Sequence, residues 1–152
     1  MINWINNKYG TNIDSADLDE IKSFTLLWNI FEGTIFQNNF SINRLDTEIQ
    51  NRNLDFQRFQ DVFNFFQRRY VVQGQFTDRF QYLNLRANDR LNLVQQVLLG
   101  VNQNDNDKLL VIGIIIYRFR NNLFHGLKDF RYLTEQVENF QNANRYLQIL
   151  LE

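Results

Sequence analysis

Cysteine and proline are both absent from this chain of 152 residues. Without cysteine the chain can form neither disulfide bonds nor thiolate metal sites, and this composition fits a reducing compartment, so we expect a cytoplasmic protein. A structural zinc site within one chain is not expected either, because there is only one histidine. We therefore expect neither a metal nor a cofactor. The absence of proline favours long, uninterrupted helices.

Long apolar runs are also missing. The longest, residues 109–117, has nine residues, whereas a transmembrane helix needs about 20. The chain begins at Met1 without a basic region followed by an apolar stretch, so we expect no secretory signal peptide. We accordingly expect no membrane partner and interpret the apolar run as a buried core helix.

Lysine is scarce, and the net charge of −1 gives the whole molecule no field that would attract a polyanion. Only four of the 16 basic residues are lysines: Lys8, Lys22, Lys108 and Lys128. Arginine suits bidentate contacts with phosphate or carboxylate groups, although ordinary surface ion pairs are the simpler interpretation for most of these side chains. Phenylalanine is abundant, with 15 residues. Most should lie in the core, and a surplus could form an oligomer interface.

Apolar residues recur three or four positions apart through most of the chain, which is typical of amphipathic helices. The first long helix should be capped by Asp14 or Ser15, Asp89 should cap a later one, and Gly74, Gly100 and Gly126 should end or bend others. No stretch alternates convincingly with a period of two. The pattern predicts helices over residues 15–35, 43–52, 56–70, 76–85, 91–98, 108–125 and 129–151.

These elements predict one domain over residues 1–152 with an all-α fold. The connections between them are short, which favours a helical bundle of about four or five main helices plus short helices.

One motif concentrates chemistry, the string RNNLFHG at residues 120–126, which contains the only histidine. An arginine, an amide and a histidine this close together suggest phosphate chemistry. On an ideal helix Arg120 falls within the apolar arc, whereas Arg118, Asn121, Asn122 and His125 fall on the polar side. Therefore either the helix breaks near Arg120, or Arg120 borders a cleft or subunit interface, or its side chain extends past the core to solvent. Arg118 shares a face with His125 and is the rival for binding phosphate.

This set of groups suits RNA cleavage without metal, in which the 2′-hydroxyl attacks the adjacent phosphate. One histidine cannot easily serve as base and acid in one step, but a symmetric homodimer would supply two histidines and two arginines to one cleft. The spacing of Arg120 and His125 has little specificity alone. The alternative interpretation is a histidine favoured by the dipole at a helix C-terminus.

The motif resembles the Arg-X4–6-His signature of HEPN domains (higher eukaryotes and prokaryotes nucleotide-binding), in the form with asparagine directly after arginine. The string LWNIFE at residues 27–32 also resembles the first long helix of some bacterial defence-associated HEPN proteins. This resemblance implies an all-α bundle that dimerises with two motifs facing one cleft. Many members are metal-independent endoribonucleases of toxin–antitoxin pairs, abortive-infection systems or RNA-targeting CRISPR effectors.

Carried over to this chain, the resemblance makes Arg120 and His125 the catalytic pair and Asn121 their supporting polar residue. Glu32 could orient Arg120, or could be a solvated acid at the edge of its helix. The residues expected to contact the RNA are Arg118, Asn122, Lys128 and Arg131.

One position departs from part of the family. Many HEPN toxins paired with a nucleotidyltransferase antitoxin carry a modified tyrosine two residues after the histidine, where this chain has Leu127. We therefore expect any antitoxin or regulatory protein to be of another kind, on a separate chain.

Three functions are consistent with these observations. The first is a toxin or antiphage defence endoribonuclease that acts as a homodimer. The second is a non-catalytic HEPN-type module that binds nucleotide, RNA or a partner protein, with which the near-neutral charge is compatible. The third is a helical interaction protein whose motif is accidental, for which the abundance of phenylalanine is the best support.

Overall fold

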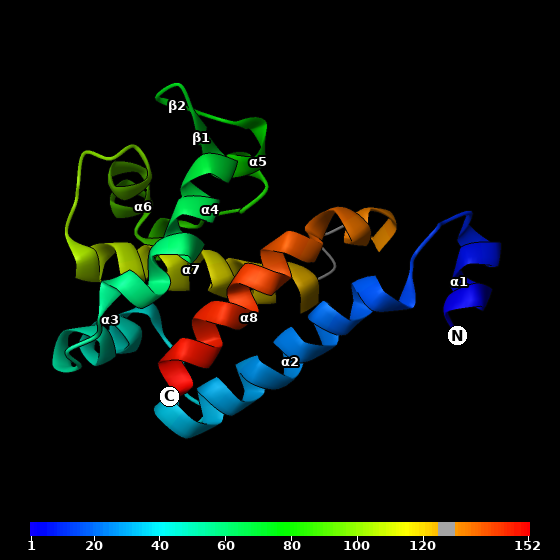
Figure 1. Ribbon diagram of the computed structural model, residues 1–152, viewed down its shortest axis with the longest axis horizontal. Helices are drawn as coiled ribbons and strands as arrows, with labels where there is room; N and C mark the ends of the chain where they lie inside the picture. Colours follow the sequence, from blue (N-terminus) through cyan, green and yellow to red (C-terminus); the bar gives the residue numbers. More distant parts are fainter. Residues whose placement is uncertain (125–129) are drawn as a thin grey trace.

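The structure is a computed structural model that describes residues 1–124 and 130–152. Within these residues it contains eight α-helices and one two-stranded hairpin (Figure 1), so the predicted all-α fold is confirmed. The α-helices are α1 (Ile2–Tyr9), α2 (Ser15–Phe36), α3 (Ile42–Asn51), α4 (Gln60–Tyr70), α5 (Asp78–Gln81), α6 (Leu91–Leu98), α7 (Asp105–Phe124) and α8 (Val137–Leu151). The 3-10 helices are η1 (Phe56–Phe59), η2 (Ala87–Asp89) and η3 (Phe130–Gln136), and the strands are β1 (Val71–Val72) and β2 (Gln75–Phe76).

Helix α7 forms the centre of the molecule. It packs against α3, α4, α6 and α8, and every residue from 109 to 116 is buried. A helix covered on all sides must be apolar in every direction, which explains the apolar run in the sequence. No helix within the described residues is long and apolar enough to cross a membrane.

Helices α2 and α8 lie side by side along one flank of the bundle (Figure 1). As predicted, Asp14 caps α2, where its carboxylate accepts a hydrogen bond from the backbone N–H of Ala16 (3.1 Å). The contact between the two helices includes the rings of Phe24 and Phe140, 5.2 Å apart, and hydrogen bonds from the amide of Asn144 to the carbonyl and carboxylate of Glu20 (3.0 and 2.8 Å). Ring packing of this kind accounts for much of the phenylalanine content.

A β-hairpin ends α4, which the periodicity did not predict. Its turn residues Gln73 and Gly74 both have positive φ (51° and 74°), as a two-residue hairpin turn requires. Thr77 follows the hairpin and closes it, because its N–H donates to the carbonyl of Tyr70 (2.8 Å) and its hydroxyl to the carbonyl of Arg69 (2.9 Å). The short helix α5 is thereby returned to the end of α4. The helix predicted over residues 76–85 is therefore wrong for most of its length.

Three other elements differ from the prediction. Helix α1 was not predicted, although Ile2, Ile5 and Tyr9 recur at helical spacing, and none of its residues is buried. The segment predicted as one helix over residues 129–151 is divided in the described part, because Tyr132 in η3 has non-helical angles (φ −108°, ψ 19°). Asp89 lies in η2 rather than capping α6, and Arg90 with a positive φ of 55° precedes that helix.

Candidate functional site

Arg118 is buried in the core, with 1% of its surface exposed. Its Nη1 lies 3.5 Å from the carboxylate of Asp89, which is itself 5% exposed, and its Nε donates to the carbonyl of Leu83 (3.1 Å). A buried arginine needs this kind of compensation, because removing its charge from water is costly. The contact with RNA that the sequence suggested for Arg118 is not available to a guanidinium enclosed in this way.

Asn122 is also fully buried, and its side chain contacts the backbone of the same loop, which follows α5. Its amide nitrogen lies 3.2 Å from the carbonyls of both Tyr82 and Leu83, and its Oδ1 lies 3.4 Å from Nη2 of Arg118. Two polar side chains of α7 thus hold the segment after α5 by its backbone. Like Arg118, Asn122 is a structural residue in this arrangement and not one that can contact RNA.

Arg120 is the more accessible of the two rival arginines, since it is only partly buried. Its Nη1 donates a hydrogen bond to Oδ1 of Asn121 (3.1 Å), and Asn121 is 7% exposed. The helical projection had placed Arg118 on a polar side and Arg120 among apolar residues. The structure reverses this, because a helix surrounded by other helices has no polar side at Arg118.

The remaining predicted residues are placed as follows. Glu32 accepts a hydrogen bond from Nε1 of Trp28, one turn earlier on α2 (3.0 Å), so its observed partner is on its own helix and not Arg120. His125 and Lys128 lie outside the described residues, and so does the side chain of Arg131.

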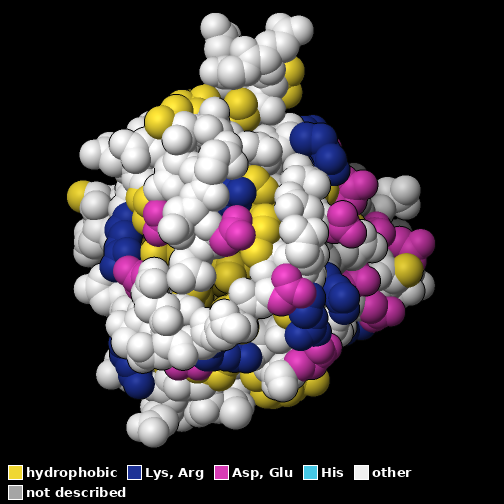
Figure 2. Space-filling model, turned by 60° about the vertical axis from the view of Figure 1, so that its left-hand side comes forward, with side chains coloured by type: hydrophobic (Ala, Val, Ile, Leu, Met, Phe, Trp, Pro, Cys, Tyr) yellow, Lys and Arg dark blue, Asp and Glu magenta, His cyan; other side chains and the backbone are white. Residues whose placement is uncertain are grey.

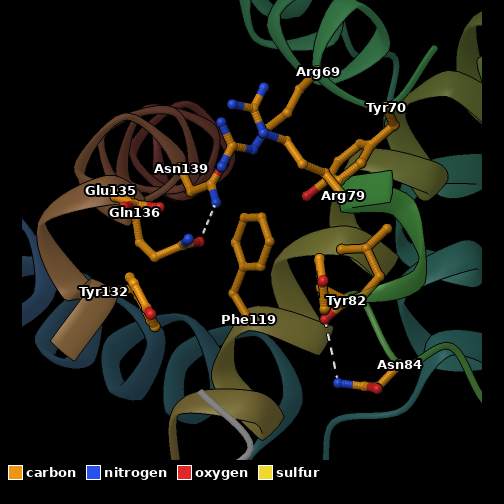
Figure 3. Close-up of a pocket in the computed structure, with 11 residues that line it drawn as sticks. Arg69, Tyr70, Arg79, Tyr82, Asn84, Phe119, Tyr132, Glu135, Gln136 and Asn139 are labelled. Carbon is orange, nitrogen blue, oxygen red and sulfur yellow. Dashed lines mark hydrogen bonds between the residues drawn. The ribbon is translucent and has the colours of Figure 1, made fainter. Parts of the chain in front are cut away.

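A pocket of about 600 Å³ lies beside the last turns of α7 (Figure 3). On one side are the end of α4, the helix α5 and the loop that follows it, and on the other are η3 and the start of α8. The ring of Phe119, the residue before Arg120, stands between the two sides (Figure 3). The residues lining the pocket are Arg69, Tyr70, Arg79, Tyr82, Leu83, Asn84, Phe119, Tyr132, Glu135, Gln136 and Asn139.

The local structure around the hairpin accounts for the position of the two arginines. Arg69 is in the last turn of α4, and Arg79 is on α5, which the hairpin places against that turn. Both guanidinium groups affect Tyr70: burial raises the pKa of its hydroxyl well above the usual value, and the two nearby positive charges counteract only part of this. The hydroxyl of Tyr70 therefore stays protonated at neutral pH.

The opposite side of the pocket carries polar side chains from η3 and α8. Asn139 is 2% exposed and donates to Oε1 of Gln136 (2.6 Å). No donor among the described residues reaches its Oδ1. Glu135 is the one carboxylate among the described residues that line the pocket. The sequence reasoning missed this site, because its lining comes from separate segments that form no motif.

The surface seen in Figure 2 has no extended patch of one charge. Lysine and arginine side chains alternate with aspartate and glutamate across this face, as the net charge of −1 suggests. Elsewhere in the described chain, Arg90 is paired with an acid: its guanidinium lies 2.6 Å from the carboxylate of Asp46 of α3.

Comparisons with known proteins return no match: no family model, no curated protein and no solved structure is similar to this chain.

Proposed function

We propose that the protein is a metal-independent endoribonuclease of the HEPN type, which cleaves RNA at a composite site in a homodimer. The observation that carries this proposal is the pair formed by Arg120 and Asn121 near the end of the central helix, five and four residues before the only histidine. The all-helical fold agrees with what the motif's resemblance implies. Its cellular role would be that of a toxin or antiphage effector restrained by a regulator on another chain.

The burial of the two arginines supports Arg120 as the phosphate-binding residue. Arg118 is occupied by Asp89 and by a backbone carbonyl in the core, so moving it to a substrate would leave a buried carboxylate unpaired. Arg120 is partly exposed, and Asn121 holds its guanidinium by one of its nitrogens. A guanidinium fixed by a neighbour is preorganised to receive phosphate oxygens.

In the proposed reaction the 2′-hydroxyl loses its proton to a base while its oxygen forms a bond to the adjacent phosphorus. The bond from phosphorus to the 5′-oxygen breaks, and an acid protonates that leaving oxygen. Arg120 stabilises the extra negative charge on the phosphorane. The His125 side chains of the two protomers would serve as the base and the acid, because one imidazole does not readily do both in one step.

The test uses the purified full chain and end-labelled RNA in the presence of EDTA. We expect cleavage to leave a 2′,3′-cyclic phosphate and to fall by about 100-fold or more in both Arg120→Ala and His125→Ala. The matched control is Arg145→Ala, which removes an exposed arginine of α8 and should cleave like the wild type. Circular dichroism and light scattering should show that all three variants are folded dimers.

Cleavage that persists in both motif variants would overturn the proposal, as would a monomer that cleaves at the full rate. A folded dimer that binds RNA but yields no cyclic phosphate would instead favour the non-catalytic module. Expression in cells tests the biological role apart from the cleavage activity. We expect the wild type to stop growth and His125→Ala to leave growth unchanged.

A further inference from the structure

We propose that the pocket between α5 and α8 is a binding site for a ribonucleoside phosphate unit, either as a free nucleotide or within an RNA chain. Its volume of about 600 Å³ lies within the usual range for small-molecule and cofactor sites. Cations, exposed aromatic rings and amide groups all line it, and a nucleotide has a counterpart for each of them. The site differs from the pair of Arg120 and His125.

Arg69 and Arg79 supply the positive charge. They come from α4 and α5, and Figure 3 shows their guanidinium ends gathered at the same side of the pocket, near Asn139. Among the described residues neither of them forms an ion pair with a carboxylate. Two guanidinium groups without an acid partner, placed side by side, repel each other, and a phosphate that receives hydrogen bonds from both removes that repulsion.

Two tyrosines supply surfaces for a base. Tyr82 is 66% exposed and Tyr132 is 56% exposed, and they lie on opposite sides of the pocket in Figure 3. A large aromatic side chain that remains exposed at the edge of a cavity has a free ring face. Stacking of bases on such faces is the usual means of holding an unpaired nucleotide, and it tolerates every base.

Asn139 belongs to the wall of the pocket between the two tyrosines and the two arginines. Its Nδ2 donates to Oε1 of Gln136 (2.6 Å), and its side chain is 2% exposed. The contacts with a nucleotide are therefore assigned to the arginines and the tyrosines, which are more exposed.

The position of the pocket connects it to the motif. Phe119 lines the pocket and is the residue before Arg120 on α7. Arg118 and Asn122 hold the pocket wall at Leu83 and Tyr82. Arg120 does not itself line the pocket, and that one RNA strand reaches both the pocket and Arg120 is a further step of the proposal. The connection between the pocket and Arg120 rests on the proposed function, whereas the binding of a nucleotide in the pocket does not.

The experiment measures binding to the full chain carrying His125→Ala, so that no RNA is consumed. The probes are the four nucleoside 5′-monophosphates, followed by calorimetry, and a fluorescein-labelled hexaribonucleotide, followed by anisotropy. We expect saturable binding that weakens at least tenfold in Arg69→Ala/Arg79→Ala. Binding should weaken about tenfold in Tyr132→Ala and remain unchanged in Tyr132→Phe, which keeps the ring.

The matched control is Arg68→Ala, which removes the neighbouring exposed arginine of α4 that does not line the pocket. Binding of the hexaribonucleotide alone identifies RNA as the source of the nucleotide, and binding of the monophosphates alone identifies a free ligand; either supports the pocket as the site.

Affinity that is the same in the pocket variants as in Arg68→Ala, or no binding of any probe, overturns this inference. These outcomes are distinguishable from failure of the proposed function. Cleavage by the wild type without pocket-dependent binding rejects the pocket alone, whereas pocket-dependent binding without cleavage rejects the ribonuclease alone.

Discussion

Arg118 and Arg120 are two positions apart on one helix and have opposite environments. Sequence spacing favoured Arg118 as a surface residue facing His125, because a single helix was assumed to have a polar side. The structure surrounds α7 with other helices, and Asp89 from η2 provides the partner that makes Arg118 tolerable in the core. Nothing in the local sequence shows that these two residues, 29 positions apart, will meet. The environment of an individual charge was therefore the least predictable feature.

Replacing Asp89 should strongly destabilise the protein. In Asp89→Ala the guanidinium of Arg118 would stay buried without its carboxylate, and the N–H of Arg86 would lose its acceptor at 2.7 Å. Breaking one side of a buried ion pair costs about 3–5 kcal/mol. We expect a loss of this size in the free energy of unfolding, measured by urea denaturation.

The control for this prediction is Asp61→Ala, which removes an exposed acid in the first turn of α4. It should cost less than about 1 kcal/mol. Equal losses in the two variants would mean that the buried pair contributes no more than a surface charge does.

Among the elements, most helices with a clear apolar period were predictable, and the β-hairpin was not. Helices α2, α3, α6 and α7 begin and end within a few residues of the predicted bounds, because each has an apolar pattern of helical period. The β-hairpin has two residues per strand, too few for a period of two to be visible. Its closure depends on the hydrogen bonds from Thr77 to the carbonyls of Arg69 and Tyr70 at the end of α4, which a pattern of apolar residues does not contain.

The close packing of α7 against α3 and α8 depends on Gly113. A Cβ at this position would overlap Cδ2 of Leu45 and would lie 2.8 Å from the hydroxyl of Tyr146. Alanine favours a helix over glycine by about 1 kcal/mol, but overpacking of a core costs about 1–3 kcal/mol. Leu45 is 1% exposed and the hydroxyl of Tyr146 is held by the carbonyl of Leu109 (2.9 Å), so neither can readily move.

We therefore expect Gly113→Ala to lower the free energy of unfolding by about 1–2 kcal/mol. Gly33→Ala on α2 is the matched control, since its Cβ would meet only Oδ1 of Asn38 at 3.4 Å. That variant should be as stable as the wild type or up to about 1 kcal/mol more stable. If Gly113→Ala raises the free energy of unfolding instead, then α3 and α8 can move away from α7 without loss of stability.

At the scale of the whole molecule, the pocket brings together segments that are far apart in sequence. Its lining comes from three regions, at residues 69–84, 119 and 132–139. Arg69 and Arg79 have no motif around them, and they are neighbours only because the hairpin returns the chain to α4. The sequence therefore predicted phosphate chemistry at the end of α7 but did not predict the pocket beside it.

The core also makes the folded state sensitive to high pH. Burial raises the pKa of Tyr70 and of Tyr146 above the ordinary value of about 10. Above that pH the unfolded chain loses these two protons while the folded chain keeps them. Because the folded state then binds more protons than the unfolded state, stability is complete below about pH 10 and falls as the pH rises further.

Each tyrosine should add a slope of about 1.4 kcal/mol per pH unit above pH 10, which urea denaturation at several pH values between 9 and 11.5 would measure. In Tyr146→Phe the slope should decrease by that amount, although the variant loses about 1 kcal/mol at neutral pH with its hydrogen bond to Leu109. Tyr9→Phe, in a residue that is 50% exposed, should leave the slope unchanged. If the slope of Tyr146→Phe matches that of Tyr9→Phe, then the hydroxyl of Tyr146 ionises in the folded protein as readily as in the unfolded chain, and the packing of α8 on α7 must open at high pH before the molecule unfolds.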